Sequence, residues 1–318
     1  MRATQMHILV VTLIFSTLSI TAKSRTGIFF EGWTEFNRKN LNLLRPKNTK
    51  ESKESALGTD KLPVARLRDI RGQLPQEIYD LCDFINNSQD FINAGATPPK
   101  GILLEGPPGT GKTSIARALA GELDVPFVSA SASSFIELYV GTGPQHVRAL
   151  FNNAQAALTR TGASHVIIFI DELDAIGSRT EFNAHSETKN TINELLVQMD
   201  GFSSDPRVIV IAATNNVDSI DEALKRRGRF DYIVRIPLPN ETSRLDILTY
   251  YLTNARFHRS LAGDASLMQI AQQTIGFSGA DLEGLADDAA LEAGRNKRRE
   301  ICQQDLELAL QKRYKNGR

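Results

Sequence analysis

A glycine-rich stretch at residues 106–113, which reads GPPGTGKT, has residue types and spacing suited to binding phosphate groups. It matches the pattern G-x-x-x-x-G-K-[ST] and stands between an apolar run and a helical pattern. Glycines let backbone N–H groups approach phosphate oxygens, and the amino end of the following helix adds positive potential. Lys112 is expected to reach the β- and γ-phosphates, and the Thr113 hydroxyl to ligate Mg²⁺. The phosphate-binding residues predicted here are Gly106, Pro107, Pro108, Gly109, Thr110, Gly111, Lys112, Thr113 and Ser114.

Two carboxylates, Asp171 and Glu172, follow directly after the apolar run 167–170. Open α/β sheets bind ligands beyond the carboxyl ends of their strands, so we expect this pair beside the phosphates. Asp171 would hold Mg²⁺, directly or through water, and Glu172 would orient and polarise the attacking water. An apolar strand followed by two acids is common by chance, but a position 58 residues after Thr113 (113 to 171) makes this pair specific.

The elements that must position these groups are indicated by an alternation of short apolar runs and amphipathic helical patterns. Runs rich in β-branched residues are typical of strands buried on both faces of a parallel sheet. The strand runs lie at 101–105, 125–130, 165–170, 207–214 and 231–238, and the helical patterns between them include 111–121, 144–159 and 186–200. After Pro239 only helical patterns remain, near 242–253, 264–274, 279–294 and 303–314. We therefore expect an α/β P-loop NTPase fold, a three-layer sandwich with a parallel sheet, over 63–238, and a small all-helical domain over 239–318.

The composition is that of an ordinary globular protein. Of 318 residues, 41% are hydrophobic and 23% are charged, which excludes a wholly disordered chain and a multi-span membrane protein. Lys+Arg and Asp+Glu both number 37, and a zero net charge argues against a broad basic surface for nucleic acid. Two cysteines, Cys82 and Cys302, cannot make a disulfide framework, so we expect a reduced compartment that contains ATP.

The N-terminal segment, residues 1–23, is strongly apolar and has no charged residue from Ala3 to Ala22. Twenty helical residues span about 30 Å, enough to cross a bilayer, and the excess of basic residues after the segment predicts that the following chain lies in the cytoplasm. A cleaved signal peptide and a buried or misassigned N-terminus remain alternatives, although Ile20 makes a poor cleavage site. Residues 24–62 are polar and irregular, which predicts a linker.

Motifs across residues 67–316 resemble those of an AAA+ ATPase, most closely the ATPase module of the FtsH-type membrane proteases. RDIRG (68–72) resembles the segment that cradles adenine, and IAATNN (211–216) resembles the sensor-1 strand near the γ-phosphate. GFSGADL (276–282) resembles the sensor-2 region of the helical lid domain. The resemblance implies nucleotide contacts by Asp69, Ile70, Gly72, Asn215, Gly279 and Ala280.

Three further segments resemble parts that act between subunits of this family. DEALKRRGRFD (221–231) resembles the second region of homology, in which Arg226 and Arg229 match two arginine fingers that reach a neighbour's ATP. MDGF (199–202) resembles an inter-subunit signalling segment, and the triplet Tyr139-Val140-Gly141 resembles an aromatic pore loop that grips an extended polypeptide. An arginine finger supplied in trans is worth about 10³–10⁵ in rate. The resemblance therefore implies a ring, of six subunits in this family, whose isolated monomer is nearly inactive.

The chain departs from the family pattern in two local places and one large one. Arg227 replaces the usual proline between the fingers, and Arg71 replaces a small residue beside the adenine segment. FtsH-type proteases continue into a zinc peptidase domain carrying H-E-x-x-H, a motif that this sequence lacks. We therefore expect ATP and Mg²⁺ as cofactors, no zinc and no intrinsic peptidase activity. The histidines, which have no ligand spacing, are His7, His146, His165, His185 and His258.

The resemblance leaves three functions in competition. The first is an ATP-hydrolysing ring that remodels, unfolds or threads protein substrates, either unfolded or membrane proteins, and is anchored in a membrane with its ATPase domain in the cytoplasm or an equivalent compartment. A soluble cytoplasmic form is the alternative location. The second is an assembly factor or regulatory subunit in a mixed ring with active FtsH-type partners. The third, a nucleic-acid motor or clamp-loader-like protein, is disfavoured by the zero net charge and the aromatic pore loop.

Overall fold

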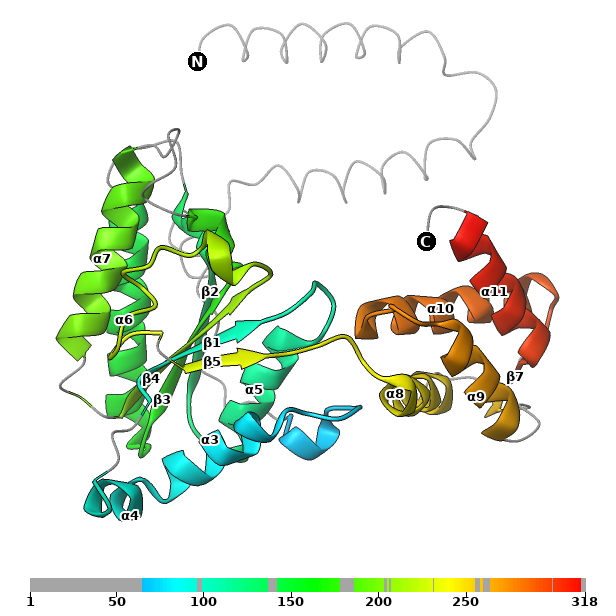
Figure 1. Ribbon diagram of the computed structural model, residues 1–318, viewed down its shortest axis with the longest axis horizontal. Coiled ribbons are helices and arrows are strands. Elements are labelled where there is room, and N and C mark those ends of the chain that lie inside the picture. The colour runs from blue at the N-terminus through cyan, green and yellow to red at the C-terminus, as the bar shows by residue number, and fades with distance from the viewer. Residues whose placement is uncertain are drawn as a thin grey trace, which may run out of the picture. The chain divides into compact units, whose positions relative to one another are not determined.

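The computed structural model describes residues 65–95, 99–136, 142–177, 186–202, 205, 207–230, 232–254, 258–259, 264–298 and 300–315 (Figure 1). All of these belong to one compact unit, Ala56–Arg318. Among these residues, no helix has both the length and the apolar character needed to cross a membrane. The predicted anchor, residues 1–23, and most of the predicted linker lie outside the described residues.

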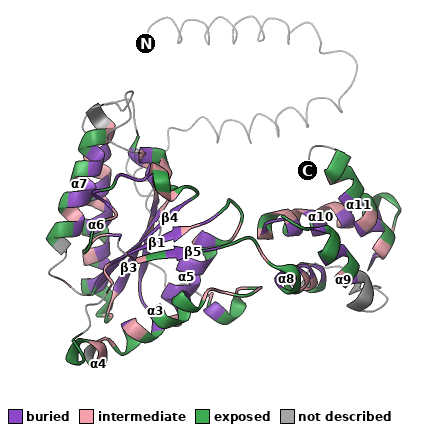
Figure 2. Cartoon of the chain, viewed as in Figure 1, coloured by how far each residue is buried: buried purple, intermediate pink, exposed green. Residues whose placement is uncertain are grey.

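A five-stranded parallel sheet forms the centre of the first half of this unit, as the apolar runs predict. Its strands are β1 (Gly101–Glu105), β2 (Phe127–Ser131), β3 (Val166–Asp171), β4 (Val208–Thr214) and β5 (Tyr232–Arg235). They are arranged in the order β2-β3-β4-β1-β5, and all four pairings are parallel. Every residue of β4 is buried, because this strand lies inside the sheet and both of its faces are covered (Figure 2).

Helices cover the two faces of the sheet and form two separate apolar cores. On one face lie α6 (Thr142–Thr161) and α7 (Ser186–Phe202), which pack on alternate strand residues such as Ile168. On the other face lie α3 (Gln76–Asn86) and α5 (Lys112–Glu122), which cover the intervening strand residues. The expected three-layer sandwich is therefore confirmed. A short helix, α4 (Ser88–Asn93), follows α3, and neither α3 nor α4 was among the elements expected from the sequence.

The second half of the unit is a helical lid with its own apolar core. Its helices are α8 (Glu241–Asn254), α9 (Asp264–Gln273), α10 (Gly279–Arg295) and α11 (Gln303–Lys315). The expectation that no strand follows Pro239 is wrong in one detail, because β6 (His258–Arg259) and β7 (Glu300–Ile301) form a two-residue parallel pair. Two residues carry too little pattern to be recognised as a strand in the sequence.

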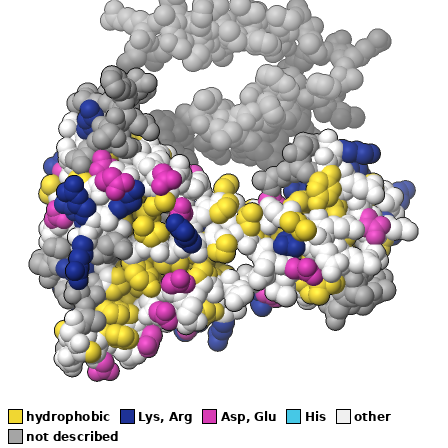
Figure 3. Space-filling model, in the orientation of Figure 1, with side chains coloured by type: hydrophobic (Ala, Val, Ile, Leu, Met, Phe, Trp, Pro, Cys, Tyr) yellow, Lys and Arg dark blue, Asp and Glu magenta, His cyan; other side chains and the backbone are white. Residues whose placement is uncertain are grey.

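Short 3-10 helices join these elements at the edges of the sheet. They span Leu67–Asp69, Ala132–Phe135, Leu173–Ile176 and Val217–Ser219. Basic and acidic side chains lie interspersed over the α/β half in the view of Figure 3. This distribution agrees with the zero net charge and gives no support to a nucleic-acid groove on that face.

Candidate functional site

The glycine-rich loop joins the end of β1 to the start of α5, at the carboxyl edge of the sheet. Gly109 and Gly111 adopt left-handed backbone conformations, with φ of 75° and 86°. Only glycine enters this region without steric cost, so the two residues let the loop turn its N–H groups inward. Because α5 begins at Lys112, its unpaired N-terminal N–H groups face the same space, which is suited to an anion.

The Lys112 ammonium group lies folded into the loop and is only 8% exposed. Its Nζ donates hydrogen bonds to the carbonyl oxygens of Gly106 (2.6 Å) and Pro107 (2.9 Å) and to Oδ1 of Asn215 (2.8 Å). Burial lowers the pKa of Lys112, and the nearby carboxylates of Asp171 and Asp174 oppose that shift. The two residues expected near a γ-phosphate, one after β1 and one after β4, are thus in direct contact.

The residues expected to hold Mg²⁺ also meet. The Thr113 hydroxyl at the start of α5 donates to Oδ2 of Asp171 at the end of β3, at 2.6 Å. A hydroxyl oxygen and a carboxylate oxygen side by side are hard ligands of the kind that Mg²⁺ prefers, and Mg²⁺ is commonly held by few protein groups together with substrate phosphates. The donor set therefore fits the ion. Among the described residues no group of three or more His, Cys, Asp or Glu side chains could hold a metal, and the absence of zinc stays a prediction.

Glu172 follows Asp171 in a strained position. Its backbone is left-handed, with φ of 53°, which is uncommon for a residue other than glycine. Its carboxylate accepts a hydrogen bond from the Ser131 hydroxyl at the end of β2, at 3.1 Å. Backbone strain of this kind costs about 1–3 kcal/mol and clusters at functional sites. The strain turns the Glu172 side chain away from the apolar core and toward the edge where the loop lies.

Asp174 is a site residue that sequence reasoning missed. Its Oδ1 accepts a hydrogen bond from the Thr214 hydroxyl at 3.1 Å and from the backbone N–H of Asn215 at 3.4 Å. Asp174 thereby fixes the end of β4 and the position of the Asn215 side chain. The signal in the sequence was a third acid three residues after Asp171, which periodicity alone cannot distinguish from a surface residue.

A cleft of about 540 Å³ lies between the loop and the lid. Its size suits a drug-sized or nucleotide-sized ligand. At one end it is lined by Pro108, Gly109, Thr110, Gly111, Lys112, Thr113, Ser114, Asp171, Glu172 and Asn215. At the other end it is lined by Asp69, Ile70, Arg71, Ile247, Tyr250, Tyr251, Gly279, Ala280 and Glu283. Of the expected nucleotide residues, Gly106 and Pro107 lie behind Lys112, and Gly72 lines a neighbouring cavity instead.

The lid residues Tyr250 and Tyr251 were not expected from the sequence. They come one turn after Ile247 on α8, and this spacing with two adjacent aromatics was the available signal. Burial and the neighbouring Glu283 carboxylate raise the pKa of Tyr251. Ala280, at the start of α10, donates its backbone N–H to the carbonyl oxygen of Gly109 at 3.2 Å, so the lid touches the phosphate loop directly.

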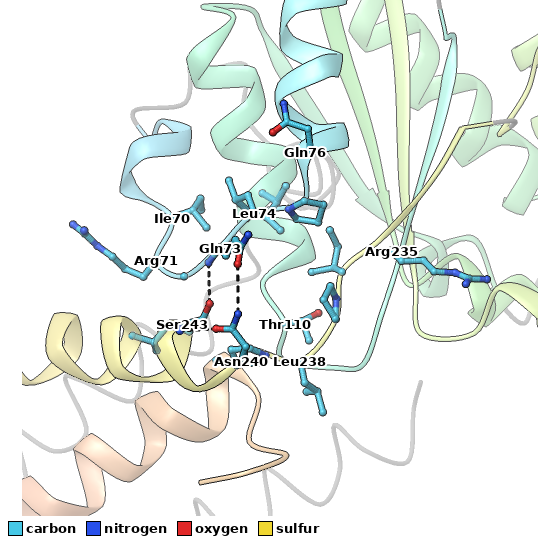
Figure 4. Close-up of a pocket in the computed structure, with 18 of the residues that line it drawn as sticks. Ile70, Arg71, Gln73, Leu74, Gln76, Thr110, Arg235, Leu238, Asn240 and Ser243 are labelled. Carbon is cyan, nitrogen blue, oxygen red and sulfur yellow. Dashed lines mark hydrogen bonds between the residues drawn. The ribbon is translucent and has the colours of Figure 1, made fainter. Parts of the chain in front are cut away.

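The neighbouring cavity, of about 380 Å³, lies where the chain passes from β5 into the lid. Figure 4 shows Gln73 and Leu74 on one wall and Asn240 and Ser243 on the other, with Thr110 of the phosphate loop at one side. This cavity and the larger cleft share Thr110 and residues 70–71.

The two expected arginine fingers differ in their surroundings. Arg229 donates from Nε and Nη2 to both oxygens of Asp200, at 2.9 and 2.6 Å, and from Nη1 to the Ala223 carbonyl oxygen at 2.6 Å. The hydrogen bonds from Arg229 hold the pKa of the Asp200 carboxyl below its ordinary value. Arg226 is exposed on the same loop. The expected pore loop, Tyr139-Val140-Gly141, lies outside the described residues.

Two family models match this chain. Residues 102–238 match the ATPase family associated with various cellular activities (AAA), and residues 264–308 match the AAA+ lid domain. The first match covers the sheet with the phosphate loop, and the second covers α9, α10 and most of α11.

Curated relatives match over most of this chain. The ATP-dependent zinc metalloprotease FtsH of Alkalihalophilus pseudofirmus is 42% identical over 271 residues, which is 84% of this chain and 38% of the relative. The ATP-dependent zinc metalloprotease YME1L1 of Mus musculus is 42% identical over 262 residues, 81% of this chain and 35% of the relative. FtsH 3 of Sphaerobacter thermophilus is 44% identical over 251 residues, 78% of this chain and 49% of the relative.

The matched region thus spans between 35% and 49% of the length of these relatives. It contains the phosphate loop, the paired acids and the lid whose contacts are described above. The chain belongs to the AAA ATPase family, with an AAA ATPase domain followed by an AAA+ lid domain, and over this region it is similar to the FtsH and YME1L1 proteins.

Proposed function

We propose that this protein is an AAA+ ATPase that binds ATP in the cleft between the sheet and the lid and hydrolyses it. The observation that carries the proposal is the direct contact of Thr113 with Asp171 and of Lys112 with Asn215. These pairs come from distant parts of the chain and converge at one edge of the sheet. Such convergence is expected where one ligand must be held by all of them at once.

Each residue of the site has a role that its geometry supports. Mg²⁺, held by Thr113 and Asp171, neutralises the developing charge on the phosphates. The buried ammonium group of Lys112 exchanges its loop carbonyl partners for phosphate oxygens, which are stronger acceptors. Glu172 orients and polarises the attacking water, and Asn215 fixes the position of the γ-phosphate.

A ring of subunits follows from the finger loop. Arg226 is exposed and is the finger free to enter a neighbour's cleft, whereas Arg229 must first leave Asp200. We propose that Arg229 acts first within its own subunit by fixing the loop. Self-association, as a hexamer in the family that the motifs resemble, completes each site with a cation that the single chain does not supply.

The finer function is protein remodelling. We propose that Tyr139, Val140 and Gly141 line a central pore and grip unfolded or membrane protein substrates, since an aromatic ring gives sequence-tolerant apolar contact. Residues 1–23 attach the ring to a membrane, with the ATPase domain in an ATP-containing compartment. The lack of H-E-x-x-H in this sequence supports a protein without peptidase activity.

The test is phosphate release from ATP by the full chain, measured across protein concentrations. Specific activity that rises steeply with concentration is the expected result, because each site needs its neighbour's finger. No activity at any concentration would overturn self-sufficient hydrolysis and favour a subunit of a mixed ring with active partners.

The threading proposal has a separate test. Tyr139→Ala is expected to keep ATP hydrolysis and to lose the unfolding of a tagged fluorescent protein substrate. Unfolding at the rate of the unaltered chain would refute the pore-loop role.

A further inference from the structure

Three consecutive residues before the phosphate loop, the segment 71–73, run along the lid helix α8 rather than along the sheet. The backbone N–H of Gln73 donates to the Ser243 hydroxyl at 3.0 Å, a contact drawn in Figure 4. The backbone N–H of Gly72 donates to Oδ2 of Asp246 at 2.8 Å. The segment therefore gives its main-chain donors to lid side chains, where a strand or helix would give them to its own element.

The third contact of the segment is a cation–π pair. The guanidinium carbon of Arg71 lies 4.8 Å from the centroid of the Tyr250 ring. The contacted positions on α8 are 243, 246 and 250, spaced by three and four residues, so they form one face of the helix. As the segment advances from residue 71 to residue 73, its contacts move back along α8, and the two chains run in opposite directions.

Gly72 is required for this close approach. Its φ of +86° is left-handed, and a Cβ built there would lie 3.1 Å from Cβ of Ser243. A side chain at this position would both strain the backbone and push α8 away. The segment is thus shaped to fit against the lid.

The chain changes partner at the base end of the cleft. Just before the segment, the backbone N–H of Leu67 donates to Oε2 of Glu122 on α5 at 3.3 Å, and Ile70 packs on the core beneath the sheet. Immediately after Ile70, the segment 71–73 belongs to the lid. Arg71 and Tyr250 both line the cleft, one from each side of this crossing.

We propose that the segment 71–73 is a latch that holds α8 across the base end of the nucleotide cleft, and that the Arg71–Tyr250 contact slows nucleotide release. The inference rests on the proposed function, because it takes the cleft to hold a nucleotide. Arg71 and Tyr250 are positioning residues. They act by keeping the lid closed over the base, while the phosphate end retains its own contacts.

The first test is the rate of release of a fluorescent ADP analogue from the full chain, measured by stopped flow. An exposed cation–π contact of this kind changes an equilibrium by about 2- to 5-fold, so Arg71→Ala and Tyr250→Ala are each expected to speed release by about that factor. Tyr250→Phe keeps the ring and is expected to release ADP at the unaltered rate. Arg68→Ala removes an exposed cation from the same region and serves as the matched control.

The double variant Arg71→Ala with Tyr250→Ala is expected to release ADP no faster than either single variant, because both remove the same contact. Release at the unaltered rate in both single variants would overturn the inference. Equal acceleration by Arg68→Ala would do so too, since the effect would then be one of charge alone.

The second test needs no nucleotide. Asp246→Ala is expected to speed hydrogen exchange at the Gly72 amide by about 2- to 10-fold, as one hydrogen bond is lost. Thr253→Ala, an exposed position of the same helix, is the control and is expected to change nothing there. Unchanged exchange in Asp246→Ala would refute the latch. Failure of the unaltered chain to bind the ADP analogue would instead refute the proposed function, and the exchange result would still report on the latch by itself.

Discussion

Two glycines of the phosphate loop provide a matched pair that measures how closely the lid packs on the loop. Gly109 and Gly111 both have left-handed φ values, 75° and 86°. A Cβ at Gly109 would lie 2.6 Å from Oγ of Ser278 and 3.0 Å from Cβ of Ala280, whereas a Cβ at Gly111 would meet nothing within 4 Å. Gly111→Ala therefore adds backbone strain alone, and Gly109→Ala adds strain and a collision with the lid.

The expected magnitudes follow from these two costs. A left-handed residue other than glycine costs about 1–2 kcal/mol, so Gly111→Ala is expected to destabilise the protein by that amount. Overpacking costs a further ~1–3 kcal/mol, so Gly109→Ala is expected to cost about 2–5 kcal/mol in all. For a domain of this size each kcal/mol lowers Tm by roughly 2–4 °C, and the two variants are expected to be separable by thermal unfolding without nucleotide.

A double variant tests the cause of the difference. Gly109→Ala with Ser278→Gly removes the Ser278 hydroxyl from the collision, and glycine at a helix N-cap costs only a few tenths of a kcal/mol. We expect Tm to recover part of the way toward that of Gly111→Ala, with the Ala280 contact still in place. Equal Tm values for the two single variants would refute direct packing of the lid on the loop.

The remaining predictions concern the site and one buried thiol. Lys112→Ala removes the only ammonium group bonded to the phosphate loop among the described residues, and it is expected to weaken ATP binding by about 10- to 150-fold in a fluorescence titration, from the ~1.5–3 kcal/mol of a charged hydrogen bond; binding of unaltered strength would contradict the site. Glu172→Gln is expected to bind ATP normally and to slow its hydrolysis by about 10²–10⁴, measured by single-turnover phosphate release, and rapid hydrolysis would remove Glu172 as the base. Burial raises the pKa of Cys82 to about 12, so a Cys302→Ser variant is expected to show no thiol reactive toward an aromatic disulfide reagent at pH 8 until it is unfolded. Prompt reaction of the folded variant would show that Cys82 is accessible.

The sheet and its cargo of site residues could be predicted from the sequence because their signals are local. Strands such as β3 are continuous apolar runs, and burial on both faces requires such runs. The meeting of Thr113 with Asp171 was predictable in turn, since parallel strands end at one edge of the sheet. Helix α3 was missed although Ile78, Leu81 and Ile85 follow a helical period, so the signal was present and not used.

Other features could not be read from the sequence because they depend on distant contacts. Arg229 pairs with Asp200, 29 residues away, and no local pattern distinguishes that arginine from the exposed Arg226. The cation–π pair of Arg71 with Tyr250 depends on how α8 lies against the segment before the phosphate loop. The substitution of Arg71 for a small residue was visible, but its partner was not.

The central claim is that this chain hydrolyses ATP in a ring, with a finger from one subunit completing the site of the next. Mixing two inactive variants of the full chain tests it most directly. Arg226→Ala keeps an intact cleft and lacks the finger, and Lys112→Ala keeps the finger and lacks the cleft. Each variant alone is expected to be inactive, with Arg226→Ala slowed by about 10³–10⁵ in phosphate release.

The mixture is expected to regain hydrolysis, with a maximum at intermediate ratios, because Lys112→Ala subunits lend their Arg226 to the intact clefts beside them. Arg68→Ala, mixed in the same way, is expected to behave as the unaltered chain does. Recovery in the mixture would establish that the finger acts between subunits. A mixture that co-assembles, as judged by co-purification through two different tags, and yet remains inactive would contradict the account, as would full activity of Arg226→Ala alone.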